Sequence, residues 1–244
     1  MDLSNFLAVR RLTDVWTSGP VGGRPGILEG AAEDMSDSTW DLIHAERERL
    51  IEDLQPLTAE QWRTQSLCPE WNVHQVLAHL VALTKQTPPK FFGKFVASGF
   101  QFNKMVAKDV AREGSGTPAE TLAELAAHVG DTTAPPGPVD SWIGEVVVHG
   151  ADIRRPLGLA YNPPVSTTRQ VADFYKNSNL LIGAKNRIVG VRLLASDSDW
   201  THGSGPEVRG PILSLVQAMT GRVIAIYDLS GEGVSTLLAR MPAG

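Results

Sequence analysis

The sequence predicts a mostly α-helical protein, with a four-helix bundle followed by a small α+β domain. Two observations predict this. Between residues 38 and 157, segments with apolar side chains at helical spacing follow one another, separated by short stretches rich in helix breakers. After them the pattern changes to short strand-like runs, glycine-rich turns and helices in separate groups. We therefore expect a bundle over residues 35–160 and a second domain over residues 161–244.

Residues 1–34 precede the first strong helix signal. They have weak periodicity, and the middle of the segment reads SGPVGGRPG, which contains six glycines and prolines in close succession. We predict a flexible N-terminal extension here.

The first two bundle helices have clear start signals. A helix is expected from Ser38 to Leu54. A capping box formed by Thr58 and Gln61 predicts a short helix after it, and a second one formed by Asn72 and Gln75 precedes the apolar stripe of VHQVLAHLVALT.

The later bundle helices are marked by prolines, glycines and caps. FFGKFVASGFQFNKMVAKDVA predicts one long helix over residues 89–112, weakened by two glycines. Thr117, with Pro118 after it, predicts the start of the next helix. Asp140 is the expected cap of a helix that ends at RRPLG. Short connections between four main helices favour an antiparallel bundle, in which facing side chains can build a site in the core.

The second domain shows a mixed pattern. Ser166 is the expected cap of a helix over residues 168–184, and residues 189–196 have strand composition. WTHGSGPEVRG predicts a strand, a glycine-rich turn and a second strand, whereas PILSLVQAMTGR and GEGVSTLLARM predict helices.

Composition excludes several functional classes. The chain has 244 residues, of which 42% are hydrophobic and 20% charged, and its net charge is −5. Basic residues are scattered, so no nucleic-acid partner is expected. No run approaches the ~20 apolar residues that span a bilayer, so no membrane partner is expected either. The single cysteine, Cys68, cannot form an internal disulfide, which favours a reducing, cytoplasmic location. We expect a monomer or weak dimer.

Three polar residues stand out in EVVVHGADIRRPLG. Glu145, His149 and Asp152 are spaced by four and three residues, so a helix places them on one face. A helical Glu and His four apart is the geometry by which one helix presents two ligands to one ion, although the same spacing is also common in exposed pairs. His79, at the edge of an apolar stripe on another helix, is either a hydrogen-bonded core histidine or a third ligand. Together these residues form a set of two histidines and a carboxylate, which leaves an open position on zinc or a similar ion.

Three segments resemble a known family. CPEWNVHQVLAHLV and EVVVHGADIRRPLG are similar to the two signature segments of the DinB-like, mycothiol-dependent maleylpyruvate isomerase family of actinobacteria. SDSDWTHGSGPEVRGPILSLVQAMTGR is similar to the C-terminal part of the same proteins. The resemblance runs from about residue 38 to the end of the chain.

The resemblance implies roles for individual residues. The family's metal ligands fall on His79, Glu145 and His149, and Asp152 occupies an acidic position that we interpret as a partner orienting His149 or a neighbouring arginine. An arginine of the C-terminal domain helps to hold the anionic substrate in isomerase-type members. Arg222 is the best match for it, with Arg209 a weaker candidate; Arg222 can equally be a cation at a helix C-terminus.

The predicted function is that of a metal-dependent, mycothiol-using enzyme. Its cofactors would be a divalent ion, preferably zinc, and mycothiol as the thiol cosubstrate. The reaction would be an isomerisation or a thiol S-transfer on a small electrophilic substrate, which can be anionic. Two alternatives stay open: a metal-dependent hydrolase that uses bound water, and a non-catalytic DinB-like protein that binds a metal or ligand. Cys68 is interpreted as a packing residue and not as a nucleophile.

Overall fold

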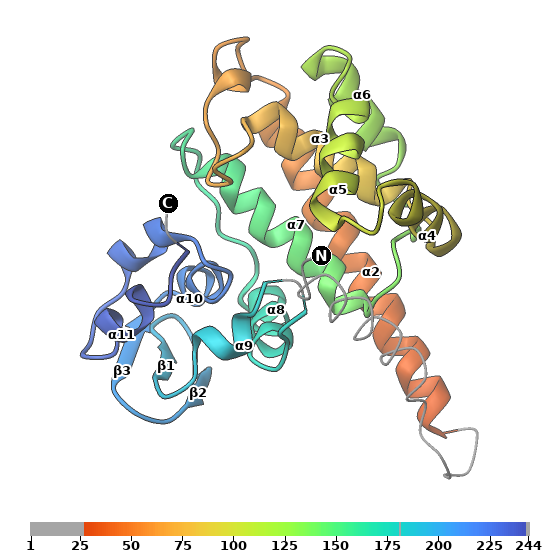
Figure 1. Cartoon of the computed structure of the whole chain (residues 1–244). Coiled ribbons are helices and arrows are strands. Elements are labelled where there is room, and N and C mark those ends of the chain that lie inside the picture. Colours follow the sequence, from red (N-terminus) through yellow and green to blue (C-terminus); the bar gives the residue numbers. More distant parts are fainter. Residues whose placement is uncertain (1–26, 181, 243–244) are drawn as a thin grey trace. The chain divides into compact units, whose positions relative to one another are not determined.

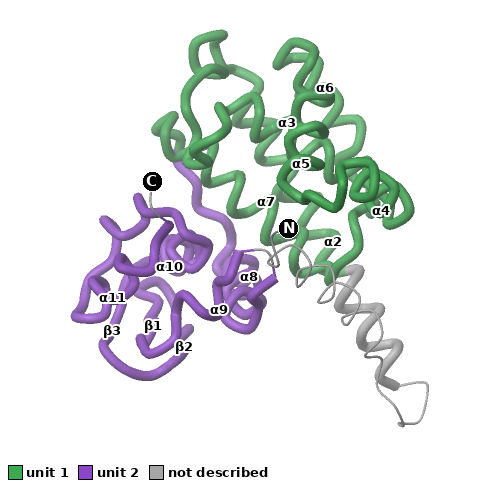
Figure 2. Tube along the Cα trace, in the orientation of Figure 1, with its two compact units in different colours: residues 1–159 green, residues 160–244 purple. Residues whose placement is uncertain are grey.

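A computed structural model confirms the predicted fold class, with helices over most of the chain and one small three-stranded sheet near the C-terminus (Figure 1). The structure describes residues 27–180 and 182–242, with side chains from Ser38 onward. The chain divides into two compact units, Met1–Leu159 and Ala160–Gly244 (Figure 2), one residue before the predicted boundary. Among the helices in the described ranges, none is long and apolar enough to cross a membrane.

Unit 1 is a helical bundle. Its elements are α2 (Ile27–Leu54), the 3₁₀ turn η1 (Gln61–Arg63), α3 (Val73–Thr84), α4 (Pro88–Ala97), α5 (Phe102–Glu113), α6 (Pro118–Ala127) and α7 (Val139–Arg154). Helix α2 packs against α6 and α7, and α3 packs against α5, α6 and α7. The core between them consists of buried apolar side chains, namely Leu50, Leu54, Trp62, Val73, Val76, Leu77, Leu80, Val81, Leu122, Leu125 and Ile153. Helix α3 therefore lies at the centre of the bundle, in contact with three other helices.

The first helix is longer than predicted. Helix α2 begins at Ile27, eleven residues before the predicted start at Ser38. The segment from Ile27 to Asp37 contains no proline and a single glycine, so nothing in it stops a helix from extending in the N-terminal direction. Residues 27–34 of the predicted extension thus belong to α2, whereas residues 1–26 lie outside the described residues.

The predicted long helix over residues 89–112 is wrong, because the structure divides it into α4 and α5. Gly99 and Phe100 both adopt left-handed backbone conformations, with φ of 66° and 59°. Two successive left-handed residues cannot continue a right-handed helix. Helix α4 ends at Ala97, and α5 starts in a new direction at Phe102.

Both predicted capping boxes are confirmed, and the predicted helix start at Thr117 also has one. Asn72 accepts a hydrogen bond from the backbone N–H of Gln75, whose side chain accepts from the Asn72 N–H. Thr117 and Glu120 form the same reciprocal pair at the start of α6. Thr58 and Gln61 do so with distances of 2.9 and 3.3 Å, although the turn that follows is a 3₁₀ helix. Each box satisfies two backbone donors that a helix N-terminus otherwise leaves without partners.

Two predicted caps are wrong. Helix α7 is preceded by Pro138, and Asp140 lies inside its first turn. Helix α8 is preceded by Pro164, so that Ser166 also lies inside the helix. Proline is well tolerated just before the first helical residue, because its φ is already close to the helical value. Both helices therefore start directly after a proline, nearer the N-terminus than predicted.

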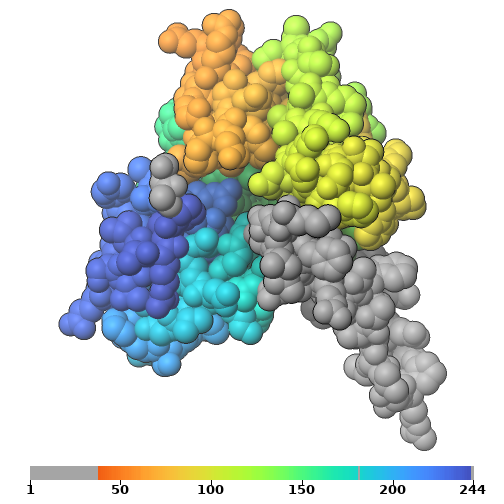
Figure 3. Space-filling view, viewed as in Figure 1, coloured from red at the N-terminus to blue at the C-terminus, as the bar shows by residue number. Residues whose placement is uncertain are grey.

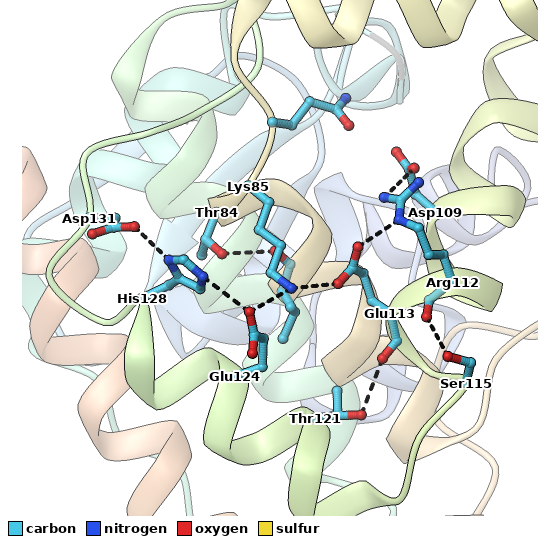
Figure 4. A network of polar contacts seen from close by, with 12 residues as sticks. Thr84, Lys85, Asp109, Arg112, Glu113, Ser115, Thr121, Glu124, His128 and Asp131 are labelled. Carbon is cyan, nitrogen blue, oxygen red and sulfur yellow. Dashed lines mark hydrogen bonds and ion pairs between the residues drawn. The ribbon is translucent and has the colours of Figure 1, made fainter.

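A polar network joins the ends of three helices in unit 1 (Figure 4). The Lys85 ammonium lies 2.7 Å from a carboxylate oxygen of Glu113 and 2.7 Å from one of Glu124, which links α3, α5 and α6. Arg112 donates to Glu113 and also pairs with the buried Asp109. Burial raises the pKa of Glu113, but the hydrogen bonds from Lys85 and Arg112 outweigh it, so this pKa is lower than usual.

Unit 2 is a small α+β domain, as predicted. It contains α8 (Val165–Tyr175), α9 (Ala184–Arg187), β1 (Arg192–Ala195), β2 (Thr201–Gly203), β3 (Glu207–Gly210), α10 (Ile212–Met219), η2 (Val223–Asp228) and α11 (Val234–Leu238). Strand β1 is central, antiparallel to β2 and parallel to β3. The predicted helix over residues 168–184 is wrong beyond Tyr175, where α8 ends before the left-handed Gly183 that precedes α9.

Candidate metal centre

Three predicted ligands meet where α3 and α7 pack together. The Nε2 atoms of His79 and His149 each lie 3.2 Å from the same carboxylate oxygen, Oε2 of Glu145. Glu145 and His149 come from successive turns of α7, and His79 reaches them from α3. The ligand atoms of the three residues all lie within 4.8 Å of one another. Their side chains are 12%, 26% and 12% exposed in the order His79, Glu145 and His149, so the cluster is mostly shielded from solvent.

This donor set fits a zinc ion. Nitrogen and oxygen ligands at 2.0–2.1 Å from a tetrahedral zinc are separated by about 3.3 Å from one another. The two observed separations of 3.2 Å match this value. Two imidazoles and one carboxylate also leave a fourth position for another ligand, which is the pattern of catalytic zinc sites. The residues present could therefore hold the ion without a large rearrangement.

Asp152 lies behind the cluster. Its Oδ2 atom is 2.9 Å from Nδ1 of His149, and the side chain is fully buried. A carboxylate at this position accepts a hydrogen bond from Nδ1–H and leaves the Nε2 lone pair directed at Glu145 and His79. This is the arrangement in which a neighbouring carboxylate orients a ligating histidine.

Cys68 lies beside the same pair, which the sequence did not reveal. Its Sγ atom is 3.2 Å from Oδ2 of Asp152 and 3.6 Å from Nδ1 of His149. The loop that carries Cys68 is tied to α7 by a hydrogen bond from the Leu67 N–H to the Asp152 carbonyl. Cys68 is only partly buried. Because more than eighty residues separate Cys68 from His149 and Asp152, no local spacing could have predicted the contact.

Trp71 packs against the histidine rings. The centroid of its ring lies 5.0 Å from that of His79 and 6.3 Å from that of His149. Ser66 and Gln65 both donate hydrogen bonds to the Trp71 carbonyl, which hold this loop in place. The Trp71 ring thus forms a wall of the candidate site.

Burial and hydrogen bonding shift the pKa values of the three candidate ligands in different directions. Burial lowers the pKa of His79 in spite of the hydrogen bond to Glu145, which favours the neutral imidazole that metals require. Burial raises the pKa of Glu145, but hydrogen bonds to His149 and His79 outweigh it and hold the pKa well below its usual range. Burial also lowers the pKa of His149, but hydrogen bonds to Asp152, Cys68 and Glu145 raise it well above its usual value. Two carboxylates thus flank His149, and a bound dication would balance their charge.

The two predicted substrate-binding arginines lie in unit 2. Arg222 directly precedes η2, and its Nη1 atom donates to the Thr220 carbonyl at 3.0 Å. Arg209 lies on β3, 3.8 Å from a carboxylate oxygen of Glu207. These contacts are local, and a role of either arginine in substrate binding stays a prediction.

Comparison with known proteins finds a family model that matches most of the helical unit. Residues 43–142 match the family model described as the mycothiol maleylpyruvate isomerase N-terminal domain. Unit 1 contains a mycothiol maleylpyruvate isomerase N-terminal domain. The matched part of this domain includes Cys68, Trp71 and His79 and ends just before Glu145.

Solved structures share the fold over most of the chain, beyond the N-terminal domain. One is the crystal structure of a mycothiol-dependent maleylpyruvate isomerase, with 13% sequence identity and a TM-score of 0.54, covering 77% of this chain and 89% of that one. Another is a histidine-to-alanine mutant of a mycothiol-dependent maleylpyruvate isomerase, with 13% identity and a TM-score of 0.56, covering 81% and 92%. No curated protein matches the chain.

Proposed function

We propose that the protein is a metal-dependent, mycothiol-using enzyme that isomerises a small electrophilic substrate or transfers the thiol to it. One observation carries the proposal: two histidine Nε2 atoms converge at 3.2 Å on one oxygen of Glu145, in a chain with a mycothiol maleylpyruvate isomerase N-terminal domain. Maleylpyruvate, the substrate in the names of the similar structures, is the first compound to test.

The residues of unit 1 have separate tasks in this proposal. His79, Glu145 and His149 would hold the ion, which would supply Lewis acidity that favours the thiolate form of a thiol near neutral pH. Asp152 keeps the proton of His149 on Nδ1, so that Nε2 is available as a ligand. Trp71 covers one side of the histidine rings and limits the access of water.

The thiol of mycothiol is the nucleophile in this scheme, and Cys68 is not required. Addition of the thiolate to an electrophilic carbon allows rotation about the former double bond, and elimination then regenerates the thiol. In a transferase the addition product would be released instead. We expect Arg222 to bind a carboxylate of an anionic substrate, since a guanidinium can form two parallel hydrogen bonds with it.

Turnover by the zinc-loaded full chain tests the proposal. Maleylpyruvate and a panel of other electrophiles are supplied with and without mycothiol, and metal content is measured on the same preparation. We expect turnover that requires both mycothiol and metal, and its loss in His79→Ala. His74→Ala is the matched control, because His74 also lies on α3 but bonds to Thr121 and is not among the three candidate ligands.

Two results would contradict the proposal. If protein that has been supplied with zinc retains almost no metal after purification, it has no metal centre. Turnover that is independent of mycothiol assigns the site to a hydrolase, in which water takes the place of the thiol.

A further inference from the structure

Helix α4 and the turn after it expose large apolar side chains. Phe92 is 42% exposed, Val96 57% and Phe100 58%, while Phe91 and Phe95 of the same helix are buried. We call Phe92, Val96 and Phe100 the α4 face. In the space-filling view, atoms of this yellow-coloured segment form part of the visible surface of unit 1 (Figure 3).

The same segment is basic in an acidic protein. From Thr87 to Lys108 the chain contains four lysines and no aspartate or glutamate, although the net charge of the whole chain is −5. Lys94 pairs with Asp109. The other three, Lys90, Lys104 and Lys108, are exposed and make no ion pair with any residue that the structure describes.

Backbone conformation holds Phe100 at the surface. Phe100 has a φ of 59°, and it is the only non-glycine residue with positive φ in the described part of the chain. A bulky side chain rarely adopts this conformation, because Cβ then approaches the following carbonyl oxygen. Phe100 contacts Phe95 edge to face, with ring centroids 5.5 Å apart, yet more than half of it faces solvent. Such strain in an exposed aromatic residue is typical of a surface that has a function.

We infer that the α4 face and the exposed lysines of the same segment dock the protein onto the surface of an anionic lipid bilayer. The sequence predicted no membrane partner because it has no membrane-spanning run, but binding at the bilayer surface does not need one. Aromatic side chains enter the boundary between headgroups and acyl chains, while lysines bind the lipid phosphates. The absence of acidic residues from Thr87 to Lys108 removes the repulsion that such a surface would otherwise exert.

Charge argues against the other possible occupants of this face. Residues 1–26 contain three arginines and two aspartates, and residues 160–244 contain eight Lys and Arg against six Asp and Glu. Both segments therefore have an excess of positive charge, of +1 and +2. A second copy of the chain, docked through the same face, would bring its lysines against these lysines. An anionic partner with apolar interior matches both the charge and the exposed aromatic rings.

Co-sedimentation with vesicles tests this inference on the full chain. The vesicles consist of phosphatidylcholine alone or of phosphatidylcholine with one-third phosphatidylglycerol. We expect binding to the anionic vesicles only, weakened by added salt. Phe92→Ser combined with Phe100→Ser, and separately Lys104→Glu combined with Lys108→Glu, should each weaken it about tenfold or more.

A matched double variant in unit 2 provides the control. Tyr227→Ser combined with Lys185→Glu also removes one exposed aromatic ring and one exposed lysine, and should bind vesicles as the natural sequence does. Thermal unfolding and metal content verify that each variant is folded.

Absence of binding to anionic vesicles, or equal binding by all variants, overturns the inference. Binding of an acidic peptide such as polyglutamate without vesicle binding overturns it too, and assigns the face to a protein partner. Because no substrate is present, the result is independent of the proposed enzymatic function.

Discussion

Replacing Asp152 with asparagine tests how the metal centre is built. The side chain of Asp152 is fully buried, and its Oδ2 atom lies 2.9 Å from Nδ1 of His149. Asparagine keeps the size of the side chain and can still accept a hydrogen bond from Nδ1–H, but it removes the negative charge that makes the imidazole a stronger ligand. Loss of such a partner typically lowers metal affinity 10–100-fold, which corresponds to about 1.4–2.7 kcal/mol.

The chain offers a closely matched control for this substitution. His128 and Asp131 form a second pair with the same three-residue spacing, in which Nδ1 and Oδ2 are 2.6 Å apart. This pair belongs to the polar network of α6 and not to the candidate metal centre, so Asp131→Asn should leave the affinity unchanged (Figure 4).

Zinc affinity is measured by competition with a chromophoric chelator on the purified full chain. Circular dichroism and thermal unfolding verify that the variants are folded. If Asp152→Asn and Asp131→Asn both bind zinc within about twofold of the natural sequence, Asp152 does not support a metal ligand, and our interpretation of His149 is refuted.

Three further predictions concern stability and the neighbouring thiol. Because the pKa of Glu113 is lower in the folded protein than in the unfolded chain, the unfolded state binds the proton of this carboxyl more tightly. The ionised carboxylate therefore stabilises the fold above pH 4.5, the unperturbed pKa, and this stabilisation is lost as pH falls through the lower pKa of the folded state. Glu113→Gln should flatten the pH dependence of the free energy of urea unfolding below pH 4.5. An unchanged slope would contradict this. Gly99→Ala should lower the free energy of unfolding by about 1–2 kcal/mol, because an alanine there must adopt positive φ, whereas Gly130→Ala, with no positive φ and no atom near the new Cβ, should not. Equal effects of the two glycine substitutions would show that the backbone conformation is not the cause. Cys68→Ser should retain zinc binding and mycothiol-dependent turnover within about twofold, since a hydroxyl can also donate to Asp152. Loss of turnover with zinc retained would make Cys68 a nucleophile.

Local sequence signals predicted three of the helix starts and part of the candidate site. The capping boxes at Thr58, Asn72 and Thr117 depend on residues three positions apart, so the pattern alone predicts their hydrogen bonds. The same holds for Glu145 and His149, which share a face of α7 because of their spacing. For the third candidate ligand, His79, the residues alone left two interpretations open, since the spacing of residues on one helix does not reveal its neighbours on another. The family resemblance favoured the ligand.

Other features depended on the tertiary structure. The backbone reversal at Gly99 and Phe100 divides a segment whose composition is compatible with one continuous helix, because packing of Phe91 and Phe95 with Met105 joins α4 to α5. Cys68 and Trp71 reach the histidines through a loop that packs on α3 and α7. The sequence alone thus determined where most of the helical segments lie, their order and the face of α7 that carries two candidate ligands. Only the tertiary structure decided which distant side chains surround them, because contacts across the bundle result from the packing of whole helices and leave no periodic pattern in the chain.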